Sequence, residues 1–224
     1  MTAFFVTGSG TDVGKTFVTA GLIRHLRGQG RIVEALKPIV SGFDPAQPAG
    51  SDPAILLCAL ARAATERELA QISPWRFKAP LSPDMAADAE ARAIDMAEVE
   101  SFCKKAILAA EDVLLIEGVG GVMVPINRVA TQLDLMVALD LPLIFVGGSY
   151  LGAISHTLSA LETLRLHGLR AQAIAISETP GSSVDLDATL ATLGNFVAAP
   201  LVALRRDASP SANEAAFAQL SASI

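Results

Sequence analysis

Short apolar runs with high strand propensity alternate along the chain with longer stretches typical of helices. The runs predict six strands, at residues 3–7, 32–36, 113–116, 143–146, 172–176 and 201–204. The longer stretches predict five helices, at residues 15–27, 53–64, 95–110, 152–167 and 184–196. Uninterrupted apolar strands such as Val113-Leu114-Leu115-Ile116 are typical of a parallel sheet that helices cover on both faces.

This alternation predicts one α/β domain over residues 1–224, with a doubly wound, mainly parallel sheet of the P-loop NTPase type. Residues 42–50 contain glycines and prolines and predict a flexible loop, and residues 73–83 predict an irregular segment. The Ser- and Ala-rich tail after Arg206 has room for one short helix.

Composition and charge exclude several classes of protein. The 224 residues are 51% hydrophobic and 18% charged, which excludes a disordered chain. Lys and Arg number 17 against 23 Asp and Glu, so the net charge of -6 argues against nucleic-acid binding. The mean hydropathy is +0.46, yet no run offers the roughly 20 clean apolar residues of a bilayer span. With two cysteines, Cys58 and Cys103, and no basic leader, we expect a cytoplasmic protein with no membrane association.

A glycine-rich turn joins the first predicted strand to the first predicted helix. It reads Thr7-Gly8-Ser9-Gly10-Thr11-Asp12-Val13-Gly14-Lys15-Thr16. Small residues let backbone N–H groups close around phosphate oxygens, the lysine reaches the β- and γ-phosphates, and the threonine hydroxyl can ligate Mg²⁺. The strict template has glycine where Ser9 stands, so this is a variant P-loop. A dinucleotide-binding fingerprint is excluded because it needs glycine or alanine where Val13 stands.

Three further polar residues end predicted strands or precede a predicted helix. Glu117 follows the strand 113–116, a position suited to holding Mg²⁺ beside a P-loop, with a solvated loop glutamate as the alternative. Lys37 ends the second strand, where it either neutralises a γ-phosphate or carbamate or is an ordinary exposed lysine. Asp52 is either a second metal ligand or the cap of the helix that begins at Pro53.

Taken together, these pieces resemble the dethiobiotin synthase family of P-loop enzymes in biotin biosynthesis. The resemblance rests on blocks that stand in the family's order: Gly10-Thr11-Asp12-Val13-Gly14-Lys15-Thr16, Leu36-Lys37-Pro38-Ile39-Val40-Ser41-Gly42, Ser51-Asp52, Phe77-Lys78-Ala79-Pro80-Leu81-Ser82-Pro83, Leu115-Ile116-Glu117-Gly118-Val119-Gly120-Gly121-Val122 and Leu151-Gly152-Ala153-Ile154-Ser155-His156. The P-loop alone indicates a superfamily, whereas the blocks around Lys37 and Glu117 together are specific.

The resemblance implies a ligase that depends on Mg²⁺ and ATP. One amine of 7,8-diaminononanoate would capture CO₂ as a carbamate, and a carbamate oxygen would attack the γ-phosphate of ATP. The second amine would close the carbamic-phosphoric anhydride into the cyclic urea, releasing ADP and phosphate. Positioning and charge neutralisation would dominate such catalysis.

The resemblance also implies roles for individual residues. Catalytic roles would fall to Lys15, Lys37, Thr11 and Ser41, and Mg²⁺ ligation to Thr16, Asp52 and Glu117. The nucleotide would be bound by Asp12, Val13, Gly14, Lys15, Thr16, Phe17, Asp52, Glu117, Gly118, Val119, Gly120, Ser177 and Glu178. The diamine would be bound by Lys37 and Ser41 of one subunit and by Gly148, Leu151, Gly152 and Ile154 of a second, which implies a homodimer.

Two segments differ from the family where relatives read the base. Ser177-Glu178 stands near the position of an Asn-Asp pair, and Ala203-Leu204-Arg205-Arg206 replaces a Gly-Glu-Ile-Pro run. ATP is the expected triphosphate, and these differences leave another nucleoside triphosphate open.

Other P-loop proteins of this fold class offer alternatives. Chromosome-partitioning and division-site ATPases carry a lysine early in the P-loop, whereas Gly8-Ser9-Gly10 has none. Amidotransferase-type synthetases of cobalamin assembly append a glutaminase domain for which this chain has no room. A small-molecule kinase and an inactive nucleotide-binding module stay open, because a P-loop indicates binding rather than turnover.

Overall fold

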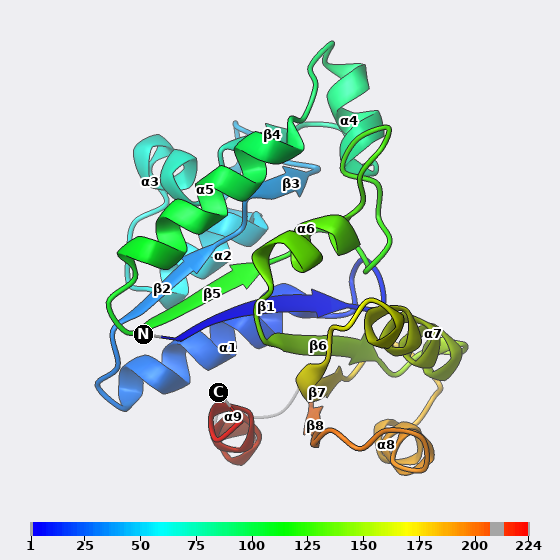
Figure 1. Ribbon diagram of the computed structural model, residues 1–224. Coiled ribbons are helices and arrows are strands. Elements are labelled where there is room, and N and C mark those ends of the chain that lie inside the picture. Colours follow the sequence, from blue (N-terminus) through cyan, green and yellow to red (C-terminus); the bar gives the residue numbers. More distant parts are fainter. Residues whose placement is uncertain (1, 207–212, 224) are drawn as a thin grey trace.

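The computed structural model describes residues 2–206 and 213–223, and its centre is a six-stranded sheet (Figure 1). The strands are β1 (Thr2–Gly8), β2 (Val33–Leu36), β5 (Val113–Glu117), β6 (Leu143–Gly148), β7 (Ala171–Ser177) and β8 (Leu201–Leu204). Their order is β2-β5-β1-β6-β7-β8, and each neighbouring pair is parallel. The six predicted strands and the parallel sheet are therefore confirmed.

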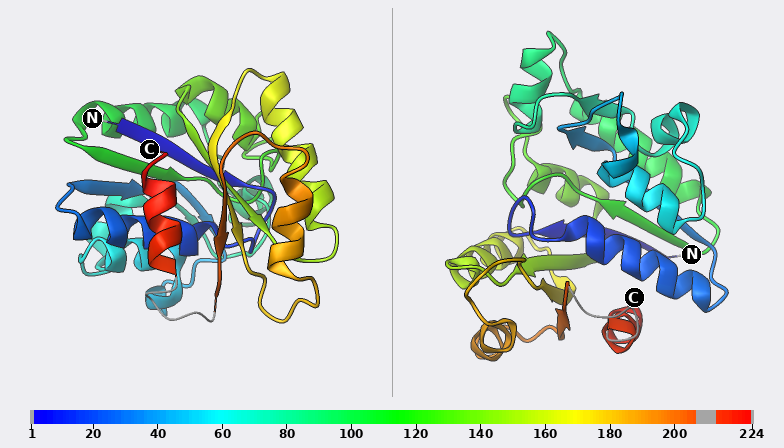
Figure 2. Two further views of the ribbon diagram at one scale, coloured as in Figure 1. Left: turned by 90° about the horizontal axis from the view of Figure 1, so that it is seen from below. Right: turned by 180° about the vertical axis from the view of Figure 1, so that it is seen from behind.

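Helices cover both faces of the sheet (Figure 2). On one face lie α1 (Lys15–Gly28), α2 (Asp52–Ala59) and α9 (Glu214–Ser221), with α1 in contact with the other two. On the opposite face lie α5 (Met96–Ala109), α6 (Gln132–Leu139) and α7 (Ala153–Leu166), and α8 (Leu186–Leu193) packs against α7. The doubly wound arrangement is confirmed, as is a short helix in the tail. None of the described helices is long and apolar enough to span a membrane.

The central strands are buried on both faces, as their uninterrupted apolar runs predict. Val6 of β1, Leu115 and Ile116 of β5, and Phe145 and Val146 of β6 are inaccessible to solvent. A sheet so deeply covered holds its carboxyl edge rigidly, because side chains packed at crystal-like density resist displacement. The loops that leave this edge after β1, β2 and β5 therefore start from fixed points.

The structure contains some short elements that the sequence did not predict. A separate parallel pair, β3 (Ile39–Ser41) and β4 (Trp75–Phe77), follows β2, so the expectation that residues 73–83 are irregular is wrong over β4. Two short helices, α3 (Glu66–Ile72) and α4 (Pro83–Ala89), were not predicted, and neither was α6. The predicted loop 42–50 contains a 3₁₀ turn, Pro48–Gly50.

The helix predicted at residues 53–64 ends early, at Ala59. Ala61 adopts the left-handed conformation with φ of +55° and turns the chain away. The carbonyl of Ala59 accepts a hydrogen bond of 2.9 Å from Arg27 of α1. A neighbouring helix thus satisfies an end carbonyl of α2, which the local sequence could not indicate.

Candidate active site

The P-loop connects β1 to α1 in a conformation that requires glycine at two points. Gly14 has φ of +97°, and a Cβ atom there would lie 2.6 Å from the hydroxyl oxygen of Ser177. A Cβ atom on Gly8 would lie 2.5 Å from the carbonyl oxygen of Val146 on β6. The loop is therefore pressed against the ends of β6 and β7, and only glycine fits these two contacts.

Lys15 is folded back along this loop. Its Nζ donates a hydrogen bond of 2.6 Å to the carbonyl oxygen of Gly10, and the residue is only 6% exposed. Burial, and secondarily the nearby charge of Lys37, lowers the pKa of Lys15 to about 8. No carboxylate of residues 2–206 or 213–223 makes an ion pair with Lys15. A buried cation in this setting is well suited to receive an anion, because binding restores the stabilisation that burial removed.

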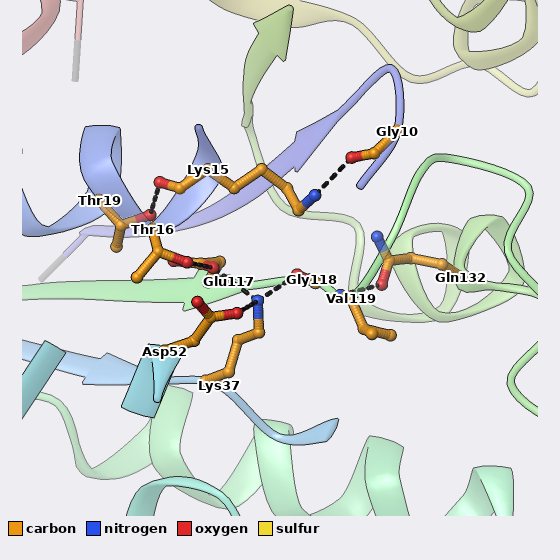
Figure 3. A network of polar contacts seen from close by, with 10 residues as sticks. All are labelled: Gly10, Lys15, Thr16, Thr19, Lys37, Asp52, Glu117, Gly118, Val119 and Gln132. Atoms are coloured by element: carbon orange, nitrogen blue, oxygen red, sulfur yellow. Dashed lines mark hydrogen bonds and ion pairs between the residues drawn. The ribbon is translucent and has the colours of Figure 1, made fainter. Parts of the chain in front are cut away.

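Lys37, Glu117, Asp52 and Thr16 form a compact polar cluster beside the P-loop (Figure 3). Nζ of Lys37 lies 2.6 Å from Oε1 of Glu117, 3.0 Å from Oδ2 of Asp52 and 3.0 Å from the carbonyl oxygen of Gly118. The hydroxyl of Thr16 donates to the same Oε1 of Glu117 at 2.6 Å. All three ammonium protons of Lys37 thus have acceptors.

The burial of Lys37 and Glu117 decides whether each is a solvated surface residue, the alternative that the sequence left open for both. Lys37 is 2% exposed and Glu117 is 0% exposed, so neither is a solvated surface residue. Burial alone would lower the pKa of Lys37, but the carboxylates of Glu117 and Asp52 outweigh it and raise that pKa. Burial acts to raise the pKa of Asp52, and Lys37 overcomes it, so this carboxyl group is held ionised.

Asp52 is not the cap of α2. It is the first residue of that helix, Ser51 occupies the cap position, and the carboxylate of Asp52 points to Lys37 (Figure 3). A carboxylate in the first turn also suits the positive end of the helix dipole. The start of α2 thus places Asp52 in the cluster.

The three predicted Mg²⁺ ligands come together here. Thr16, Asp52 and Glu117 offer a hydroxyl and two carboxylates, and Oε2 of Glu117 is buried with no hydrogen-bond partner in the described chain. Residues 2–206 and 213–223 contain no group of three His, Cys, Asp or Glu side chains that could hold a metal without other ligands. The set formed by Thr16, Asp52 and Glu117 has only oxygen donors, and only two of them are carboxylates. Such a set fits Mg²⁺, a cation that keeps several waters and substrate oxygens as ligands.

A cleft of about 1080 Å³ opens over the P-loop and the cluster. Most of the predicted site residues line it: Thr11, Asp12, Gly14, Lys15, Thr16, Phe17, Lys37, Ser41, Asp52, Val119 and Gly120. The hydroxyl of Ser41 is buried and has no hydrogen-bond partner among the described residues, so it is available to a ligand in the cleft. A volume of this order suits a nucleotide-sized ligand.

Other predicted residues do not line the cleft. Val13 is buried against the loop, with Cγ2 3.1 Å from the position of a Cβ atom on Gly8. Ser177 lies behind Gly14, and Oε2 of Glu178 accepts a hydrogen bond of 3.0 Å from the backbone N–H of Arg206. Glu117 contributes through the cluster rather than as part of the wall, with Gly118 next to it. The four positions expected to serve a second subunit also lie outside the cleft of their own chain: Gly148, Leu151, Gly152 and Ile154.

Two residues that sequence reasoning missed support the site. Oε1 of Gln132 accepts a hydrogen bond of 2.7 Å from the backbone N–H of Val119, and a Cβ atom on Gly118 would collide with the same side chain. Gln132 thereby holds the glycine-rich loop after β5, although no sequence motif links it to that loop. Arg206 also lines the cleft, and its guanidinium lies over the ring of Phe17. The only sequence signal for Arg206 is that residues 203–206 replace the Gly-Glu-Ile-Pro run of the family.

Comparison with known sequences points in one direction. Residues 2–206 match a family model described as an AAA domain. The ATP-dependent dethiobiotin synthetase BioD of Methylobacterium nodulans is 49% identical over 187 residues, covering 81% of this chain and 83% of that protein. The synthetase of the same name from Caulobacter sp. (strain K31) is 47% identical over 204 residues, covering 90% and 86%. That of Legionella pneumophila (strain Lens) is 35% identical over 205 residues, covering 91% and 92%.

Solved structures with a similar fold are far more distant in sequence. The MinC:MinD cell division complex of Aquifex aeolicus aligns with a TM-score of 0.54 at 11% identity, covering 91% of this chain and 81% of that chain. Chloroplast FtsY from Physcomitrella patens aligns with a TM-score of 0.52 at 13% identity, covering 96% and 64%. At such identities the likeness concerns the P-loop NTPase fold alone.

Proposed function

The chain belongs to the ATP-dependent dethiobiotin synthetase family, and we propose that it closes the ureido ring of dethiobiotin from 7,8-diaminononanoate, CO₂ and ATP. The observation that carries the proposal is the cluster beside the P-loop in which buried Lys37 and Glu117 meet Asp52 and Thr16. A P-loop accounts for binding of a triphosphate. A second buried lysine facing the same cleft supplies charge for a second anion, as a carbamate would be.

The proposed reaction has three steps in which the protein forms no covalent bond. One amine of the diamine first adds to the carbon of CO₂ and loses a proton to solvent, which gives the carbamate. A carbamate oxygen forms a bond to the γ-phosphorus while the bond to the β-phosphate oxygen of ATP breaks and ADP leaves. The second amine then attacks the carbonyl carbon of the anhydride, phosphate departs with the former carbamate oxygen, and the amine proton passes to solvent. Catalysis of this kind rests on alignment and charge neutralisation.

Four side chains have direct roles in this proposal. Lys15 neutralises charge on the β- and γ-phosphates, and Lys37 neutralises charge on the carbamate and the transferred phosphoryl group. The proposal for Ser41 rests on its buried hydroxyl in the cleft wall, which has no partner in the described part of the chain and can donate to the substrate. Thr11 lies in the loop over the cleft and donates to phosphate.

Thr16, Asp52 and Glu117 would hold Mg²⁺, which when bound offsets the negative charge of the triphosphate. The ammonium group of Lys37 contacts the carboxylates of both Asp52 and Glu117, so the two carboxylates that would hold the ion also hold this lysine in place. The backbone of residues 117–120 would help to seat the nucleotide, and the hydrogen bond from the Val119 N–H to Gln132 supports this role.

The proposal includes a second subunit and a cytoplasmic location. Leu151 is 90% exposed at the turn before α7, where an apolar side chain is well suited to contact another chain. A homodimer in which this turn of one subunit completes the diamine site of the other accounts for its separation from its own cleft. Both cysteines are free, which fits a reducing compartment that supplies ATP.

Phosphate release tests the proposed function. Mg-ATP, 7,8-diaminononanoate and bicarbonate are supplied together and then omitted one at a time, with the organic product identified by mass spectrometry. The synthetase releases phosphate only when all are present and forms a cyclic urea. Phosphorylated diamine without need for CO₂ would instead identify a kinase, and release without diamine would identify an ATPase.

A further inference from the structure

Arg206 lies at the wall of the cleft just beyond the end of β8. Its backbone N–H is held by Glu178, and its guanidinium carbon lies 4.5 Å from the centroid of the Phe17 ring. Nη2 lies 3.0 Å from the position that a Cβ atom on Gly14 would take. Arg206 therefore stands over the two residues that flank Lys15-Thr16, where the P-loop passes into α1.

The charge of Arg206 is not matched by any carboxylate in the described part of the chain. Its neighbour Arg205 makes a two-pronged ion pair with Asp187, with N–O distances of 2.7 and 2.8 Å, whereas Arg206 makes none with a described residue. Nε of Arg206 is buried and lacks a hydrogen-bond partner there, and burial lowers the pKa of this guanidinium. A partly buried cation with an unused donor gains stabilisation from a ligand that brings an acceptor.

The chemistry of a guanidinium limits which part of a nucleotide it can select. It carries five N–H donors and no acceptor. Guanine, cytosine and uracil each present a carbonyl oxygen, whereas adenine has none and offers an amino donor beside its ring nitrogens. The P-loop amides and Lys15 serve the phosphates, and a guanidinium that lies over the ring of Phe17 suits a planar base.

We propose that Arg206 is a base-selecting residue that donates hydrogen bonds to the carbonyl edge of the nucleotide base. The inference rests on the proposed function, since it names the class of triphosphate that the synthetase accepts: bases with a carbonyl acceptor, in addition to or in preference to adenine. Glu178 is a positioning residue for this contact, because it holds the backbone of Arg206.

Direct nucleotide binding tests the proposal without diamine or CO₂. Dissociation constants are measured by calorimetry for non-hydrolysable ATP, GTP, CTP and UTP analogues with Mg²⁺, using the wild-type chain, Arg206→Gln and Arg206→Lys. Glutamine pairs well with adenine, so Arg206→Gln is expected to shift affinity from at least one carbonyl-bearing analogue toward the ATP analogue by about tenfold. Arg206→Lys keeps the charge but loses the planar fork, and part of the same shift is expected.

Arg205→Gln is the matched control, because Arg205 is ion-paired on the surface with Asp187. It should leave all four constants unchanged. Equal weakening of every analogue by Arg206→Gln would identify a phosphate contact and overturn the proposal, and so would unchanged constants in a variant that keeps the wild-type melting temperature. A chain that has the expected selectivity but forms no cyclic urea would overturn the proposed function and leave this inference standing.

Discussion

At the scale of single residues, Lys37 lies in the polar cluster beside the P-loop and lines the same cleft as Lys15. Its ammonium group is enclosed by Glu117, Asp52 and the Gly118 carbonyl, and its burial is offset by these three acceptors. The same group faces a cleft in which two anions are expected to react. Its removal should therefore affect the chemical step more than nucleotide binding.

Replacing Lys37 with methionine keeps the aliphatic stem and removes the charge. Turnover is expected to fall about tenfold or more, because an electrostatic donor to the reacting anions is lost, while ATP still binds through the P-loop. The comparison is Lys104→Met, since Lys104 pairs with Glu100 on the surface of α5. Steady-state kinetics and ATP binding measure the two effects, and near-normal turnover of Lys37→Met would remove this lysine from the reaction.

Lys15 predicts a pH dependence of nucleotide binding. With its pKa lowered to about 8 by burial in the free protein, Lys15 is charged below that pH and loses its charge as the pH rises above it. Triphosphate binding favours the charged form, so at about pH 8.5 binding should be accompanied by proton uptake and should weaken as the pH rises further.

Calorimetry in two buffers of different ionisation enthalpy measures this uptake. The observed binding enthalpy is expected to differ between the buffers for the wild-type chain. Arg24→Met, which removes a charge from the cleft wall without changing Lys15, should keep the difference. Identical enthalpies in both buffers for the wild-type chain would contradict the assignment.

Residue identity alone could predict Lys15 and Thr16 but could not decide the setting of Lys37 or Asp52. The P-loop is a local pattern whose geometry follows from consecutive residues. Buried Lys37 is paired with Glu117, which is 80 positions away in the chain. The same holds for Arg206, whose partners Phe17 and Glu178 lie on other elements.

At the scale of elements, the tail helix α9 is held by its contact with α1. Gly21 on α1 lies beneath Phe217 on α9, and a Cβ atom on Gly21 would overlap the aromatic ring. The ring centroid of Phe217 also lies 6.4 Å from that of Phe17, which lines the cleft. The packing of the tail is thus connected with the wall of the site.

Gly21→Ala is expected to displace Phe217 and loosen α9. The cost should be about 1–3 kcal/mol of unfolding free energy, as for other overpacked cores. Gly28→Ala is the matched control on the same helix, because a Cβ atom there meets nothing within 4 Å. Amide exchange of residues 214–221 measures the effect, and equal protection in the two variants would contradict this role for Gly21.

The sequence predicted the long elements well and the short ones poorly. The three-residue strands β3 and β4 pair with each other from positions far apart, and runs so short carry no recognisable alternation. Start signals were present for α3 and α6, since Thr65 caps α3 and Thr131 with Asp134 forms a capping box for α6. Those helices were therefore predictable from their caps, whereas the Ala59 carbonyl at the end of α2 is paired with Arg27 on another helix.

At the scale of the whole molecule, the parallel sheet places the ends of β1, β2 and β5 at one edge. These strands are neighbours in the sheet (Figure 1), so Lys15, Lys37 and Glu117, which follow or end them, lie close together (Figure 3). That residues 1–224 form a single domain, and that two copies share the diamine site, stay predictions.

In the proposed reaction a carbamate oxygen attacks the γ-phosphate while both anions lie in this cleft. In the most direct measurement, CO₂ labelled with ¹⁸O is supplied in a single turnover with ATP and the diamine. The masses of the released phosphate and of the dethiobiotin are then measured by mass spectrometry. Labelled oxygen from CO₂ is expected both in the phosphate and in the urea carbonyl. Unlabelled phosphate released together with labelled dethiobiotin would contradict it.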